Sequence, residues 1–155
     1  MGAWVVHGSM GAWVHGAGPD LANPAGMAKK PHYTSLVVWQ RADELFIRLH
    51  RLASKTFPVQ ERHELSAQLR RAALSVPTNI VEGTARFHDG ETLHFLRIAW
   101  GSLQEVGYLI HVANRLAYVS QDRADELGRE IRQIAAPLSG LIASYERRRA
   151  RAAPR

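Results

Sequence analysis

The sequence predicts an all-α fold, in which residues 33–146 form one antiparallel, up-down-up-down four-helix bundle. In four long segments, apolar residues recur at spacings that alternate between four and three, as in helices that bury one stripe. Short linkers join these segments, and none of the segments alternates like a strand. With 155 residues and 46% hydrophobic content, the chain suits a single domain with a sizeable core.

The first predicted helix runs from about Leu36 to Lys55. Its apolar stripe consists of Val38, Ala42, Leu45, Leu49 and Leu52. A second stripe on the same helix is mostly basic and consists of Arg41, Glu44, Arg48, Arg51 and Lys55. Residues three or four apart share one surface of a helix, so this basic stripe is a candidate anion-binding face. A solvated outer face of the bundle is the alternative interpretation.

The second predicted helix begins at Phe57-Pro58, because proline is tolerated in the first turn of a helix. It ends at Gly83, a residue type that commonly stops helices. Its apolar stripe consists of Leu65, Leu69, Ala72, Val76 and Ile80. Pro77 lies inside this helix and removes one backbone hydrogen bond. We expect a kink there and no break, because the stripe keeps its phase across the proline.

The third predicted helix starts with Asp89 as its cap and continues to about Tyr118. Its stripe consists of Leu96, Ala99, Leu103, Val106, Ile110, Ala113 and Leu116. The small residues Gly101, Ser102 and Gly107 leave room for a close approach of another backbone.

The fourth predicted helix is capped by Ser120 and reaches Tyr145 despite Pro137 and Gly140. Its stripe is the most regular in the chain and consists of Leu127, Ile131, Ile134, Leu138, Leu141 and Tyr145.

Both ends of the chain are expected to lie outside the bundle. Residues 1–32 are predicted to be a disordered extension whose short near-repeat, MGAWVVHG and MGAWVHG, cannot build a repeat fold. Met27 resembles an ordinary cytosolic start, so our hypothesis is that residues 1–26 arise from the choice of start site. Residues 147–155 are predicted to be a basic tail.

The positive charge is concentrated near the C-terminus. The chain has a formal net charge of +6, yet residues 27–146 carry 15 basic and 13 acidic side chains. An arginine tail can bind phosphates by releasing counterions, although many such tails are solvated helix ends. The candidate nucleic-acid-binding residues are therefore Arg41, Arg48, Arg51, Lys55, Arg147, Arg148, Arg149 and Arg151.

Composition excludes several classes of protein. The chain has no cysteine, which excludes structural disulfides, thiolate zinc sites and cysteine nucleophiles. No apolar run approaches the roughly 18 residues of a membrane span, and the N-terminus lacks the pattern of a signal peptide. We therefore expect a cytoplasmic protein without a membrane partner.

The sequence predicts no catalytic residue, metal site, cofactor or small-molecule substrate, and so no enzyme. A di-iron bundle needs two Glu-x-x-His pairs, and only Glu91 with His94 forms one. The zinc motif His-Glu-x-x-His is approached at His63-Glu64, but Ala67 replaces its second histidine. No phosphate-binding glycine loop or serine motif with a base is present.

Two segments, Gln68-Leu-Arg-Arg-Ala-Ala-Leu-Ser-Val-Pro-Thr-Asn-Ile-Val-Glu-Gly83 and Phe95-Leu-Arg-Ile-Ala-Trp-Gly-Ser-Leu-Gln-Glu105, closely resemble a known family. This is the "four helix bundle protein" family, first noticed in reading frames within intervening sequences of bacterial large-subunit ribosomal RNA genes. Val38-Trp39-Gln40 and Phe57-Pro58 also match, so the resemblance spans Leu36 to about Leu141.

The resemblance implies a small cytosolic bundle without established enzymatic activity, often assembled as a homopentamer. Relatives include accessory proteins of diversity-generating retroelements, which bind a reverse transcriptase and nucleic acid through basic surfaces. By position, the family-motif residues are Arg70, Arg71, Ser75, Pro77, Asn79, Glu82, Gly83, Gly101, Ser102 and Glu105.

These family-motif residues are open to a purely structural interpretation. Arg71 could pair with Glu105 between the second and third helices, and Asn79 could satisfy backbone groups released by Pro77. The chain departs from the family pattern at Trp100, Gly107 and Pro137, which bears on any inherited charged site and on the subunit interface.

Two functions remain open at this stage. One is an oligomeric accessory protein that binds RNA or DNA through the basic stripe and the arginine tail. The other is a protein-interaction scaffold, with an apolar interface that includes Trp39 or Trp100 and with basic residues that only solubilise it.

Overall fold

The computed structural model describes residues 33–152, apart from the side chain of Arg62. The predicted disordered extension of residues 1–32 and the hypothesis about residues 1–26 lie outside this range. Within it the chain forms four long helices and two short 3-10 turns, and no strand. The elements are η1 (Tyr33–Ser35), α1 (Val37–Thr56), η2 (Val59–His63), α2 (Leu65–Thr84), α3 (Asp89–Arg115) and α4 (Gln121–Ala152).

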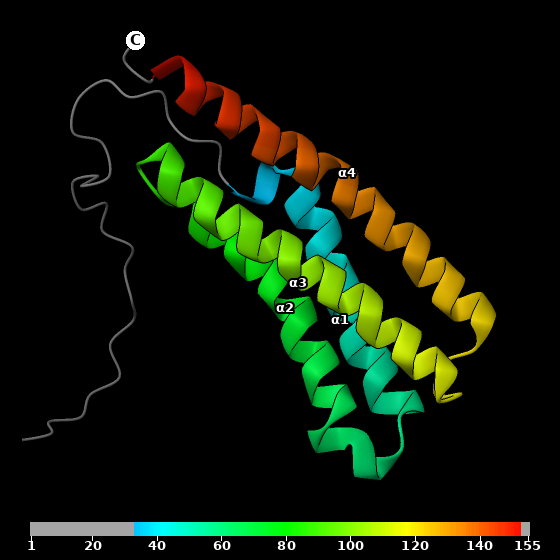
Figure 1. The fold of residues 1–155 in the computed structure, drawn as a ribbon. Helices are drawn as coiled ribbons and strands as arrows, with labels where there is room; N and C mark the ends of the chain where they lie inside the picture. The colour runs from blue at the N-terminus through cyan, green and yellow to red at the C-terminus, as the bar shows by residue number, and fades with distance from the viewer. Residues whose placement is uncertain (1–32, 153–155) are drawn as a thin grey trace, which may run out of the picture.

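The four helices pack as the predicted four-helix bundle. Successive helices run in opposite directions and are joined by short turns (Figure 1). Helix α2 packs against α1 and α3, while α4 packs against α3 and closes the bundle against α1. Both α2 and α4 continue as helices through Pro77 and Pro137. No helix between residues 33 and 152 combines the length and the apolar composition that crossing a membrane requires.

The start of the second helix differs from the prediction. Phe57 is extended and its side chain is buried in the core, so the chain turns here and forms η2 before α2 begins at Leu65. The Oε2 of Glu61 accepts a hydrogen bond at 3.3 Å from the backbone N–H of Leu65, the first residue of α2. This N–H has no partner inside the helix. Its Oε1 accepts a bond from the Tyr118 hydroxyl at 3.0 Å, which joins two linkers at this end of the bundle.

The ends of α3 and α4 also differ in detail. Asp89 is the first helical residue of α3 and not its cap. Ala117 adopts a φ of 60°, which ends α3 earlier than predicted and leaves Leu116, a predicted core residue, 48% exposed. Ser120 caps α4 as predicted, since its Oγ accepts a hydrogen bond from the Arg123 N–H at 3.4 Å. Helix α4 then continues to Ala152, so residues 147–152 are its last turns.

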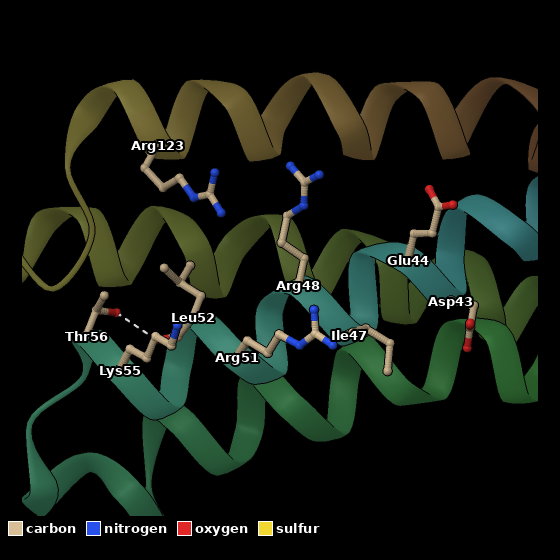
Figure 2. A pocket seen from close by; sticks show the side chains of 9 residues that line it. All are labelled: Asp43, Glu44, Ile47, Arg48, Arg51, Leu52, Lys55, Thr56 and Arg123. Atoms are coloured by element: carbon tan, nitrogen blue, oxygen red, sulfur yellow. Dashed lines mark hydrogen bonds between the residues drawn. The ribbon is translucent and has the colours of Figure 1, made fainter.

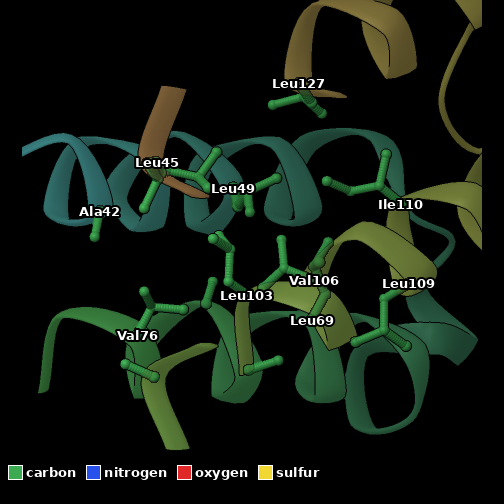
Figure 3. Close-up of a cluster of buried hydrophobic side chains, with 14 of the residues drawn as sticks. Ala42, Leu45, Leu49, Leu69, Val76, Leu103, Val106, Leu109, Ile110 and Leu127 are labelled. Carbon is green, nitrogen blue, oxygen red and sulfur yellow. The ribbon is translucent and has the colours of Figure 1, made fainter. Parts of the chain in front are cut away.

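All four helices contribute apolar side chains to one core (Figure 3). Apart from Leu116, the predicted apolar stripes face this core. The largest side chains that are almost fully buried in this core are Leu49, Leu69, Ile80, Leu93, Leu96, Leu103, Leu127, Ile134 and Leu138. The helical periodicity therefore identified the buried faces correctly.

Close approach of two backbones occurs at Gly83, where the sequence predicted only a helix stop. A Cβ at this position would lie 3.2 Å from both the Phe95 Cβ and the Thr92 carbonyl oxygen. Gly101, for which close approach was predicted, has no heavy atom within 4 Å of the same point. The small residue that α2 and α3 need for their packing is therefore Gly83.

Candidate nucleic-acid interface

The basic stripe of α1 is exposed, and two of its cations contact α4. Arg48 Nη1 donates hydrogen bonds to Glu130 Oε1 at 2.6 Å and to Glu126 Oε1 at 3.0 Å. Arg41 Nη1 donates to the backbone carbonyl of Gln133 at 2.8 Å. Two of the four predicted cations of this stripe therefore attach α1 to α4.

The remaining two cations, Arg51 and Lys55, line a surface groove of about 470 Å³ (Figure 2). Neither takes part in an ion pair or hydrogen bond within the described part of the chain. The groove lies along α1 beside the start of α4. Its lining residues are Asp43, Glu44, Ile47, Arg48, Arg51, Leu52, Lys55, Thr56 and Arg123.

Arg123 adds a cation to this groove from α4, and it was not among the predicted site residues. Its guanidinium pairs with Glu126, which also binds Arg48. The sequence contained a signal, because Arg123 precedes Glu126 and Glu130 by three and seven residues and so shares a helix face with them. Nothing in the sequence, however, placed that face against α1.

Charge is unevenly distributed along the groove. Lys55 and Arg123 lie at one end and Asp43 and Glu44 at the other, while the Arg51 guanidinium extends along α1 toward Ile47 (Figure 2). Side chains of Ile47 and Leu52 add apolar surface to the groove. The groove thus offers a cationic end for an anion and an acidic end for a hydrogen-bond donor.

The two glutamates that hold Arg48 have pKa values shifted in opposite directions. A hydrogen bond from Arg123 is the main cause that lowers the pKa of Glu126. Burial raises the pKa of Glu130, and this outweighs the opposing attraction of Arg48. Folding therefore makes Glu126 easier to ionise, and Glu130 harder to ionise, than a free glutamate.

Two substitutions should consequently have opposite effects on stability. The stabilisation from Glu126 is present above its ordinary pKa of 4.5 and is lost as pH falls through its lowered folded pKa. We expect Glu126→Gln to lower the midpoint of thermal unfolding at neutral pH, and the difference to shrink at about pH 3.

For Glu130 the sign is reversed. Stability that depends on its neutral form is present below 4.5 and is lost as pH rises through the raised folded pKa. We expect Glu130→Gln to raise the unfolding midpoint at neutral pH. Equal effects of the two substitutions at neutral pH would contradict this assignment, and calorimetry at both pH values measures them.

The C-terminal arginines lie far from the groove. Arg148 Nη2 pairs with Asp89 Oδ1 at 3.1 Å, and its guanidinium lies 4.8 Å from the centre of the Tyr145 ring. The other three described arginines of this segment, Arg147, Arg149 and Arg151, are exposed on the last turns of α4. They are separated from Arg123 by most of α4, roughly 35–40 Å at 1.5 Å per residue. The two predicted basic regions are therefore separate surfaces at opposite ends of the bundle (Figure 1).

Three of the family-motif residues form a polar network between α2 and α3. The Oγ atoms of Ser75 and Ser102 are 2.8 Å apart. Asn79 Nδ2 donates to Ser75 Oγ at 2.9 Å and to the Ser75 carbonyl at 2.7 Å. The carbonyl that loses its helical partner to Pro77 belongs to Ala73, so Asn79 bonds a neighbouring carbonyl and not that one.

The other family-motif residues have varied surroundings. Arg71 and Glu105 are both exposed, and no ion pair joins them in the described residues. Glu82 pairs with Arg86, one turn further along the chain. Pro77 and Gly83 are buried, Arg70 is half-buried, and Gly101 is exposed. The structure thus brings together Ser75, Asn79 and Ser102, but does not gather all ten residues into one site.

The residues considered for metal chemistry lie apart. His63, Glu64, Glu91 and His94 are all exposed. Between residues 33 and 152, no three histidine, aspartate or glutamate side chains are grouped so that they could hold a metal ion.

A family model and a solved structure are similar to this chain. The model of a family described as 23S rRNA-intervening sequence protein matches residues 34–140. The fold is similar to a crystal structure from Bacteroides thetaiotaomicron VPI-5482, of a protein of unknown function from the S23 ribosomal protein family. The TM-score is 0.64 at 22% identity, covering 68% of this chain and 98% of that one, which supports the fold alone. No curated protein matches this chain.

Proposed function

This chain belongs to the 23S rRNA-intervening sequence protein family, and from that premise we propose that it is a non-enzymatic accessory protein that binds nucleic acid. It acts in the cytoplasm as a homo-oligomer, and a pentamer is the assembly that its resemblance implies. The groove between α1 and α4 is the binding surface, and the exposed arginines at the end of α4 form a second contact.

The observation that carries this proposal is that Arg51 and Lys55 line the groove and have no carboxylate partner among residues 33–152. Unpaired cations neutralise phosphates more readily than cations held by carboxylates, because no ion pair has to be broken before counterions are released. Arg48 and Arg41 are engaged with α4, so they position the groove and do not serve as free phosphate contacts.

A scaffold function is the second candidate, and exposed apolar side chains favour it. Ile98 and Tyr108 are 39% and 66% exposed, and their spacing places them with Gly101 on one face of α3. Leu74 on α2 is 48% exposed. Trp39 and Trp100 are half-buried against the core, so they contribute less to such an interface than the sequence suggested. This apolar face also supports self-association of the chain.

Sedimentation velocity of the purified protein, alone and with a labelled single-stranded RNA, separates the two functions. At about 50 mM salt the RNA should sediment with the protein, and at about 200 mM most of it should be released. The protein alone should sediment as an oligomer under both conditions. If the protein sediments as an oligomer but carries no RNA at either salt concentration, the proposed function is contradicted and the scaffold function is supported instead.

A further inference from the structure

We infer that the groove between α1 and α4 receives an unpaired nucleotide, with the phosphate at its cationic end and the base directed toward Glu44. This inference rests on the proposed nucleic-acid binding and specifies the form of nucleic acid that the groove takes. It follows from the order of charged, planar and apolar side chains along the groove.

The cationic end suits a single phosphate. Lys55 lines it from α1 and Arg123 lines it from α4, and Arg51 follows one turn earlier on α1 (Figure 2). Arg51 and Lys55 have no partner in the described chain, so their donors are free for the phosphate oxygens. Further along the groove the acidic side chains begin, so the cationic surface does not continue as a track for a chain of phosphates.

The middle of the groove offers a platform for a base. The Arg48 guanidinium is planar and is fixed by hydrogen bonds to Glu126 and Glu130, yet its side chain is 44% exposed. Bases of single strands stack on guanidinium planes as they do on aromatic rings. The apolar side chains of Ile47 and Leu52 border the same space.

The acidic end suits the amino edge of a base. Glu44 precedes Arg51 by seven residues, so the two lie about 10 Å apart along α1. The Glu44 carboxylate has no bonded partner in the described chain and points toward α4 (Figure 2). A carboxylate accepts a hydrogen bond from the N4 amino group of cytosine, whereas it repels a carbonyl oxygen such as O4 of uracil.

A duplex fits this groove poorly. Its bases are paired and lie inside, so a surface groove would meet a continuous phosphate backbone. Asp43 and Glu44 would then face phosphates and repel them. The groove therefore favours a single strand, although a duplex has the greater charge density.

Fluorescence anisotropy with RNA of about 12 nucleotides tests this inference. The probes are oligocytidine, oligouridine and a duplex of oligocytidine with oligoguanosine, at constant salt. Oligocytidine should bind about tenfold more tightly than oligouridine, as expected for one hydrogen bond to a charged group. It should also bind more tightly than the duplex.

The variant Glu44→Gln should reduce the ratio of the two affinities to about 3 or less, because a neutral amide can also donate to O4 of uracil. Glu105→Gln removes the same charge from an exposed position on α3 and should leave the ratio unchanged. Equal affinities for oligocytidine and oligouridine, or tighter binding of the duplex, would overturn the inference while leaving nucleic-acid binding intact. Absence of binding to every probe would overturn the proposed function itself.

Discussion

Leu103→Ala should lower the free energy of unfolding by about 2–5 kcal/mol, the range for leucines removed from closely packed cores. Leu103 is 0% exposed and belongs to α3, which packs against both α2 and α4. It lies among leucine and valine side chains at the centre of the core (Figure 3). Helices on several sides hold the space open, so the bundle can collapse only partly around the missing atoms.

Urea denaturation followed by circular dichroism measures this change, provided that both proteins unfold in one transition with the same slope. Leu74→Ala is the matched control, because Leu74 is 48% exposed on α2. It should change the stability by no more than about 0.5 kcal/mol. If the two substitutions had similar costs, Leu103 would not lie at the centre of the core.

Gly83→Leu should cost about 3 kcal/mol, the upper part of the usual range for overpacked cores. Its Cβ alone would stand 3.2 Å from the Thr92 carbonyl oxygen, which belongs to the backbone of α3 and cannot rotate away. The remaining side-chain atoms must then separate α2 from α3, which exposes their shared apolar surface. Chemical denaturation of the variant gives the cost directly.

Gly101→Ala is the control for this substitution and should have the opposite sign. Gly101 lies inside α3 with no heavy atom within 4 Å of the new methyl group. Alanine should therefore stabilise the bundle by about 0.5–1 kcal/mol through its better helix propensity. Stability unaffected by Gly83→Leu would show that α2 and α3 do not approach closely at this position.

Much of the fold could be predicted because helical periodicity records burial directly. The stripe from Leu127 to Tyr145 faces the core as its spacing indicated. The predicted helix ends were wrong where the burial or the backbone conformation of a single residue sets the end. Phe57 turns into the core and delays the start of α2, and the positive φ of Ala117 ends α3 before Leu116. Neither effect changes the spacing of apolar residues, so helical periodicity could not predict it.

The candidate site could be predicted only in part. The sequence predicted Arg51 and Lys55 as site residues, but not which cations of the basic stripe would form hydrogen bonds with α4. That depends on the rotation of α4, which brings Glu126 and Glu130 against Arg48 and adds Arg123 to the groove. Side-chain contacts between helices 78 or more residues apart in sequence, such as Arg48 with Glu126, are set by packing and not by local pattern.

The central claim is that the unpaired cations of the groove bind nucleic acid, and a salt titration of RNA binding tests it most directly. Each phosphate contact to a single strand contributes about −0.7 to the slope of log affinity against log salt, so Arg51 and Lys55 together should contribute about −1.4 to the wild-type slope. The double variant Arg51→Ala/Lys55→Ala should therefore have a slope less steep by about 1.4 than that of the wild-type protein, and should bind RNA about tenfold or more weakly at low salt.

The control Arg129→Ala/Arg132→Ala removes the same charge from exposed positions on α4 and should keep the slope within about 0.3 of the wild-type value. Anisotropy titrations of one labelled RNA at several salt concentrations measure all three slopes. The account predicts a loss confined to the Arg51 and Lys55 variant. Equal slopes for the two double variants would contradict it, because binding would then depend on overall charge and not on the groove.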